Sequence, residues 1–121
     1  MSWLAPFTDV ECCDIVTVGR KSGQPRKNEL WFGVVHDTLI LVSGTAHSDW
    51  RQNMLAHPSV EVHINGNVRM GTARMVTDTD ERRACGDVMA AKYDWDGDPS
   101  IGLTRHAWCY EVPVMAISNW I

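Results

Sequence analysis

Apolar and polar residues alternate over several stretches of the chain, and this alternation predicts a mainly β structure. The clearest stretch is residues 59–76, where valine or isoleucine occupies every second position up to Asn65-Gly66 and apolar residues resume at Val68 and Met70. Asn-Gly is a favoured two-residue hairpin turn. We therefore predict two antiparallel strands joined at this turn.

Three further stretches have strand patterns. Residues 13–20 are rich in β-branched side chains, residues 27–44 contain two apolar runs separated by a predicted turn at His36-Asp37, and residues 107–117 form a last apolar run. Such runs, bounded by turn residues, are typical of strands. Together with the hairpin they predict about six strands.

Two helices fill the remaining gaps. Ser48 is a helix-capping residue type before residues 49–57, and Pro58 ends that segment. Acidic residues open a second helix near 78–93, in which Gly86 lowers the helix propensity. Strands in meander order with two short helices indicate a small antiparallel barrel of the mostly-β or α+β class.

The composition narrows the functional classes. The 121 residues suit one domain spanning residues 1–121, and 45% hydrophobic residues suffice for a core. A net charge of −4 argues against a general nucleic-acid binder. No apolar run is long enough for a membrane span, and the first residues do not resemble a signal peptide. We therefore expect a cytoplasmic protein that acts on a small molecule.

The cysteines and histidines do not predict a metal site. The four cysteines form no Cys-x-x-Cys pair, and the five histidines are scattered along the chain. Zinc sites use ligand pairs at short, regular spacing. We expect reduced thiols and no bound metal.

Cations gather in one short stretch of this acidic chain. The sequence VGRKSGQPRKNEL, residues 18–30, places Arg20, Lys21, Arg26 and Lys27 around a Ser-Gly turn. One interpretation is a hairpin tip left in water. The other is a cradle for an anion, since arginine donates in a planar fork that suits phosphate or carboxylate. Spacing alone leaves both open.

The same stretch resembles the signature of the deazaflavin-dependent nitroreductase family. This family belongs to the flavin-binding split β-barrel superfamily, which includes pyridoxamine phosphate oxidases. The segments TLILVSG, DWRQNMLAHPSVEV and GTARMVTDTDERRA fit the family pattern in the same order. The resemblance covers roughly residues 15–95.

The resemblance implies a six-stranded antiparallel split β-barrel with two or three short helices, usually a homodimer. It also implies the cofactor F420, an 8-hydroxy-5-deazaflavin with a phosphate and an oligoglutamate tail. The residues that align with the phosphate and tail side are Arg20, Lys21, Ser22, Arg26, Lys27 and Asn28. Those that align along the ring are Trp31, Val42, Ser43 and Gly44. Trp50 and Asn53 align with contacts from the short helix.

Several of these residues have a simpler interpretation. Trp50 and Met54 are four residues apart, a spacing more often used for core packing. Asn53 is also compatible with a solvated helix face, and Ser43-Gly44 with an ordinary strand end.

The resemblance implies an oxidoreductase that transfers a hydride between reduced F420 and an electron-poor small molecule: a quinone, an enone or a nitro compound. The chain lacks the tyrosine-rich C-terminal segment of the nitroimidazole-reducing members, and only Ser43 and Tyr93 are candidate proton donors. One alternative is an FMN-dependent oxidoreductase on the same fold. Another is a non-catalytic protein that binds a flavin or an apolar ligand.

Overall fold

The computed structural model describes residues 2–44 and 48–121. The strands are β1 (Cys12–Val18), β2 (Pro25–Trp31), β3 (Gly33–Val35), β4 (Thr38–Val42), β5 (Ser59–Ile64), β6 (Asn67–Met75), β7 (Gly97–Asp98), β8 (Leu103–Thr104) and β9 (Val114–Ser118). The helices are α1 (Asp49–Ala56), α2 (Thr79–Lys92) and α3 (Arg105–Tyr110), with 3-10 turns η1 (Ala5–Phe7) and η2 (Pro99–Ile101).

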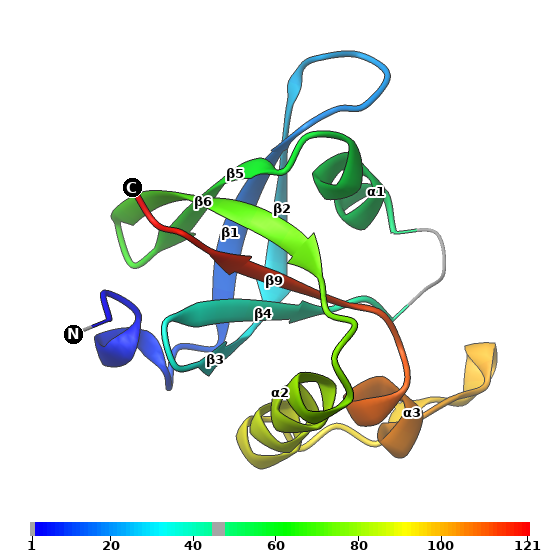
Figure 1. The fold of residues 1–121 in the computed structure, drawn as a ribbon. Helices are drawn as coiled ribbons and strands as arrows, with labels where there is room; N and C mark the ends of the chain where they lie inside the picture. The colour runs from blue at the N-terminus through cyan, green and yellow to red at the C-terminus, as the bar shows by residue number, and fades with distance from the viewer. Residues whose placement is uncertain (1, 45–47) are drawn as a thin grey trace.

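Seven strands form one antiparallel sheet in the order β2-β1-β5-β6-β9-β4-β3 (Figure 1). The expectation of six strands in a barrel is therefore corrected: the sheet has seven strands and is not closed. The extra strand arises because the first run of residues 27–44 is divided at the fully buried Phe32. Strand β2 pairs with β1 and β3 pairs with β4, so a single residue carries the chain from one sheet edge to the other.

Both predicted hairpin turns are confirmed. Asn65 and Gly66 have φ values of 48° and 83°, as a two-residue turn with two left-handed residues requires. His36 also has a positive φ, and Val35 pairs with Thr38 across that turn. The helices predicted at 49–57 and 78–93 correspond to α1 and α2.

The strand predicted at residues 107–117 is wrong in its first half. Residues there belong to α3, and β9 begins only at Val114. The Thr104 hydroxyl accepts a hydrogen bond from the Ala107 amide at 3.0 Å, which caps the helix. The side chains of Trp108 and Cys109 are buried in a cluster with residues of α2. Capping and burial together favour the helix over an extended strand.

Two hydrophobic clusters lie on opposite faces of the sheet. In β4, Leu39 and Leu41 belong to one cluster and Ile40 to the other. The side chains of β9 alternate in the same way. Because both faces of these strands are covered, their sequences are continuously apolar rather than alternating.

The helices occupy two different regions of the molecule. Figure 1 shows α2 and α3 packed together beside β3 and β4, whereas α1 lies near the projecting β1–β2 hairpin. Among residues 2–44 and 48–121, no helix is long and apolar enough to span a membrane.

Candidate functional site

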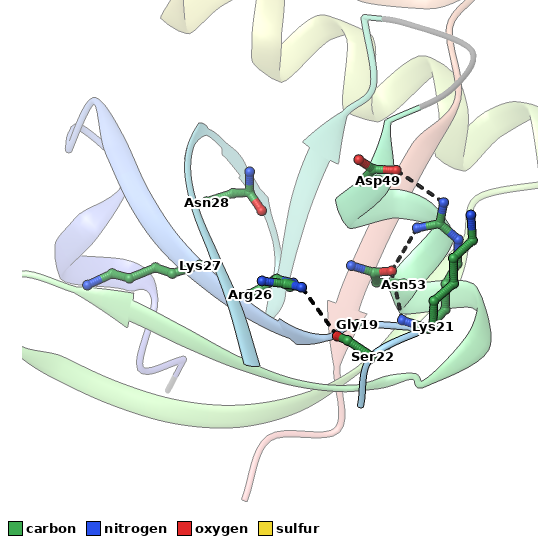
Figure 2. Close-up of a pocket in the computed structure, with 9 residues that line it drawn as sticks. Gly19, Lys21, Ser22, Arg26, Lys27, Asn28, Asp49 and Asn53 are labelled. Atoms are coloured by element: carbon green, nitrogen blue, oxygen red, sulfur yellow. Dashed lines mark hydrogen bonds and ion pairs between the residues drawn. The ribbon is translucent and has the colours of Figure 1, made fainter. Parts of the chain in front are cut away.

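An open pocket of about 420 Å³ lies between the β1–β2 hairpin and α1 (Figure 2). Its lining is rich in cations and amides. The lining residues are Gly19, Arg20, Lys21, Ser22, Arg26, Lys27, Asn28, Asp49 and Asn53. We call this the cationic pocket.

The hairpin tip folds back on itself through its glycines. The Gly19 amide donates to the Gln24 carbonyl at 2.8 Å, and the Gly23 amide donates to the Gly19 carbonyl at 2.8 Å. A Cβ atom on Gly19 would lie only 2.5 Å from the Ser22 Oγ. Gly23 has a φ of 70°, which favours glycine. The tight turn therefore favours glycine at position 23 by its backbone conformation, whereas a side chain at position 19 would require Ser22 to move.

Successive side chains of a strand point to opposite faces, and this separates Arg26 from Lys27 on β2. Arg26 pairs with the buried Thr17, and its Nη2 donates to Ser22 Oγ at 3.4 Å. Lys27 points the other way in Figure 2, and its Nζ lies 3.5 Å from Asp14 Oδ2. Arg26 therefore reaches toward the hairpin tip, whereas the Lys27 ammonium lies on the opposite face of the strand.

Arg20 joins the hairpin to α1. Its backbone amide and its Nη1 both donate to Asn53 Oδ1, at 3.1 and 2.9 Å. Its Nη2 donates to Asp49 Oδ1 at 3.1 Å. Asn53 is 4% exposed and its Nδ2 donates to Thr17 Oγ1 at 3.4 Å. The buried amide thus holds both the backbone and the guanidinium of Arg20.

Seven of the twelve residues predicted to bind the cofactor line the cationic pocket: Arg20, Lys21, Ser22, Arg26, Lys27, Asn28 and Asn53. The other five, Trp31, Val42, Ser43, Gly44 and Trp50, lie outside its lining. Trp50 is 8% exposed and packs with Met54 in a hydrophobic cluster, so its surroundings match the core-packing interpretation.

The end of β4 lies beside the start of α1. The Oγ atoms of Ser43 and Ser48 are 2.7 Å apart, and the Ser43 amide donates to the Pro113 carbonyl at 2.8 Å. A Cβ atom placed on Gly44 would be 3.6 Å from Leu103 and 3.9 Å from Trp108. Ser43 and Gly44 therefore link the surroundings of the cationic pocket to an aromatic region.

That aromatic region contains Trp31, Tyr93, Trp95 and Trp108. Trp31 stacks on Tyr93 with ring centroids 4.3 Å apart and an angle of 3° between the planes. Trp95 and Trp108 contact Trp31 edge-on, at 6.5 and 5.9 Å. Tyr93 and Trp108 are buried, so these rings pack mainly against one another in the hydrophobic cluster beside α2.

Tyr93 has a hydroxyl surrounded by backbone groups. The hydroxyl accepts from the Phe32 amide at 3.1 Å and lies 2.6 Å from the Glu11 carbonyl and 3.0 Å from the Phe32 carbonyl. Burial raises the pKa of Tyr93 to about 12. These contacts favour a structural role for Tyr93 over that of a proton donor.

The sequence interpretation missed two lining residues, Gly19 and Asp49. Asp49 had a usable signal, because it precedes Asn53 by four residues and such residues share a helix face. Gly19 had none beyond its place in the turn, since its role depends on a close approach of Ser22.

Comparison with known proteins gives the family. The model of the F420H(2)-dependent quinone reductase family matches residues 6–97. The chain belongs to this family. It is therefore an F420-dependent reductase, an oxidoreductase with coenzyme F420 as its cofactor. These findings confirm the predicted family resemblance, enzyme class and cofactor, and FMN becomes the secondary alternative.

Solved structures with similar folds agree with the split-barrel prediction. An F420-H2 dependent reductase (FDR-A) has a TM-score of 0.70 and 23% identity, over 91% of this chain and 96% of that one. Conserved hypothetical protein Rv2991 from Mycobacterium tuberculosis has a TM-score of 0.66 and 19% identity, over 97% and 79%. A putative pyridoxamine 5'-phosphate oxidase from Listeria innocua has a TM-score of 0.64 and 17% identity, over 94% and 87%. At these identities the likeness concerns the fold.

Proposed function

We propose that this F420-dependent reductase transfers a hydride to an electron-poor small molecule, a quinone first among the candidates, and that the cationic pocket holds the anionic end of the cofactor. The observation that carries the proposal is that three cations, Arg20, Lys21 and Arg26, line one open pocket. The family name supports the quinone as acceptor.

The chemistry of the pocket fits a cofactor with several negative charges. Charge-assisted hydrogen bonds from guanidinium to phosphate or carboxylate are short and strong, and arginine binds in a planar fork. Ser22 adds a hydroxyl, and Asn28 adds an amide. A multiply charged ligand uses this density of donors more fully than a single phosphate does, which favours F420 over FMN.

The other end of the cofactor is proposed to lie at the end of β4, where Gly44 leaves room beside Leu103 and Trp108. When bound, reduced F420 supplies the hydride, while the protein binds it, orients it and excludes water. The residues that would orient the ring are Ser43 and Gly44 at the end of β4, with Trp108 beside them. The Ser43–Ser48 contact places this strand end next to α1, which also borders the cationic pocket.

The test compares Arg26, a cation of the cationic pocket, with Arg83, a cation outside its lining. Arg26→Ala should raise the dissociation constant for F420 about tenfold or more, because a charge-assisted hydrogen bond contributes about 1.5–3 kcal/mol. Arg26→Lys should recover part of the loss, since lysine lacks the planar fork. Isothermal titration measures the affinities, and oxidation of reduced F420 by a quinone measures turnover.

Arg83→Ala is the matched control. It removes the same charge from an exposed position on α2, outside the lining of the cationic pocket. We expect less than about a threefold change in affinity, because exposed charges interact weakly through water. Equal losses in Arg26→Ala and Arg83→Ala would show a general effect of charge, and no loss in either would restore the solvated-tip interpretation.

A further inference from the structure

The cationic pocket contains a carboxylate of its own. Of the described residues that line it, Asp49 alone is acidic. Its Oδ1 accepts a hydrogen bond from Arg20 Nη2 at 3.1 Å. A carboxylate oxygen at that distance makes the same contact with Arg20 that a phosphate or glutamate oxygen would make.

Arg20 does not need Asp49 to keep its orientation. Asn53 Oδ1 already accepts from the Arg20 backbone amide and from Nη1. Asn53 is nearly inaccessible to water, and a buried amide that lost these partners would be left unsatisfied. The contact between Asn53 and Arg20 is therefore the permanent one.

The contact between Asp49 and Arg20 is easily exchanged. The Asp49 side chain is 83% exposed, and exposed ion pairs contribute little to stability. Asp49 also lies in the first turn of α1, where a negative charge is favourable without any partner. A rotation of this side chain would free Arg20 Nη2 toward the open pocket.

We infer that Asp49 is a built-in competitor for the cofactor: it occupies on Arg20 the position that an anionic group of F420 takes on binding. This inference rests on the proposed function of the cationic pocket. Binding then replaces the Asp49–Arg20 contact while Asn53 keeps Arg20 in place. Asp49 thereby lowers the affinity for every anionic ligand and selects for ligands that bring enough charge to displace it.

The opposite interpretation is that Asp49 helps to position Arg20. The two interpretations predict opposite signs for one substitution. If Asp49 competes, Asp49→Asn lowers the dissociation constant for F420, by about two- to fivefold at low ionic strength. If Asp49 positions Arg20, Asp49→Asn raises it.

Asp80→Asn is the matched control. Asp80 also lies in the first turn of a helix, α2, and its substitution changes the net charge equally, but it does not line the cationic pocket. We expect Asp80→Asn to bind F420 with the affinity of the wild type. Asp49→Asn should also bring no gain in an Arg20→Gln background, because the competition acts through Arg20.

The experiment is a titration of F420 against the full chain and these variants, together with turnover of reduced F420 with a quinone. A wild type that binds no F420 would overturn the proposed function and this inference with it. A wild type that binds and turns over, with Asp49→Asn unchanged or weaker, would overturn this inference alone. A gain that persists in the Arg20→Gln background, or that Asp80→Asn reproduces, would overturn it as well.

Discussion

Asn53 and Asp49 both contact Arg20, but the Asn53 side chain is buried and the Asp49 side chain is exposed. Asn53 is enclosed and forms three hydrogen bonds, so breaking them would leave polar groups without partners. Asp49 is in water, where its ion pair is weak. The neutral side chain therefore fixes the geometry of the hairpin tip, and the charged one adjusts how strongly it attracts an anion.

Substitution of Tyr93 distinguishes a structural role of its hydroxyl from a role as proton donor. Tyr93→Phe should lower the free energy of unfolding by about 1–3 kcal/mol, because the Phe32 amide loses its acceptor. Turnover of the folded variant at neutral pH should remain, as a structural role requires. Urea unfolding and F420 oxidation measure the two effects. A stable variant without turnover would instead make Tyr93 the proton donor.

Comparison of the wild type with Tyr93→Phe also tests how the stability of the fold depends on pH. The pKa of Tyr93 in the fold, about 12, is higher than the ordinary tyrosine value near 10. Its neutral hydroxyl therefore stabilises the fold fully below about pH 10, and this contribution is lost as the pH rises toward 12. The wild type should lose stability more steeply than Tyr93→Phe over that window. If stability falls with the same slope against pH in both proteins, the raised pKa of Tyr93 is contradicted.

For individual residues, the sequence could predict the cations of the pocket but not the side chains that hydrogen-bond to them. The motif of residues 18–30 located Arg20 and Arg26 because the charges are local. The contacts of Arg20 with Asp49 and Asn53 span 29 and 33 residues. Such pairs depend on how α1 packs against the hairpin, which no local pattern contains.

At the scale of elements, Gly86 shows why helix propensity alone misleads. In an exposed helix, Gly→Ala gains about 1 kcal/mol of stability. Here α3 packs so closely on α2 that a Cβ atom on Gly86 would meet the ring of Tyr110 and lie 2.7 Å from the Cys109 carbonyl. The close contact between the two helices requires a residue without a side chain.

We predict that Gly86→Ala destabilises the protein by about 1–3 kcal/mol, since overpacking forces neighbours to shift. Thermal or urea unfolding measures the change. In a Tyr110→Ala background the ring is absent, so Gly86→Ala should there cost less free energy of unfolding than it does in the wild type. A stabilised single variant would show that α3 moves away without penalty.

The elements with local signals are those that the sequence predicts well. The β5–β6 hairpin follows from Asn65-Gly66, and α2 follows from its acidic first turn. Helix α3 has six residues, too few for its periodicity to be distinguished from that of a strand. Its formation depends on burial against α2, a tertiary effect.

At the scale of the whole molecule, the order of the strands is not accessible to local patterns. The buried Phe32 divides one predicted strand into β2 and β3, which become the two edges of the sheet. Edge strands expose backbone groups that can pair with another chain. One of these edges, β2, carries Arg26 and Asn28 of the cationic pocket.

This arrangement leads to a prediction about assembly. We propose a homodimer whose interface lies near the cationic pocket, so that a second copy covers the open side of the cofactor site. Light scattering at micromolar concentration should give twice the 13.6 kDa mass of one chain. A second observation supports this location: Leu55 is a large apolar side chain on α1, the helix that borders the pocket, and it is 50% exposed.

Two matched substitutions test where the interface lies. Leu55→Lys should shift the equilibrium toward monomer, because an interface that buries Leu55 would have to desolvate the new charge. Ile101→Lys changes a similarly exposed side chain, 57% exposed, in the η2 turn rather than on α1. It should leave the mass at that of the dimer. If the wild type is monomeric at micromolar concentration, the dimer is wrong. If Ile101→Lys alone dissociates it, the interface includes the η2 turn instead of α1.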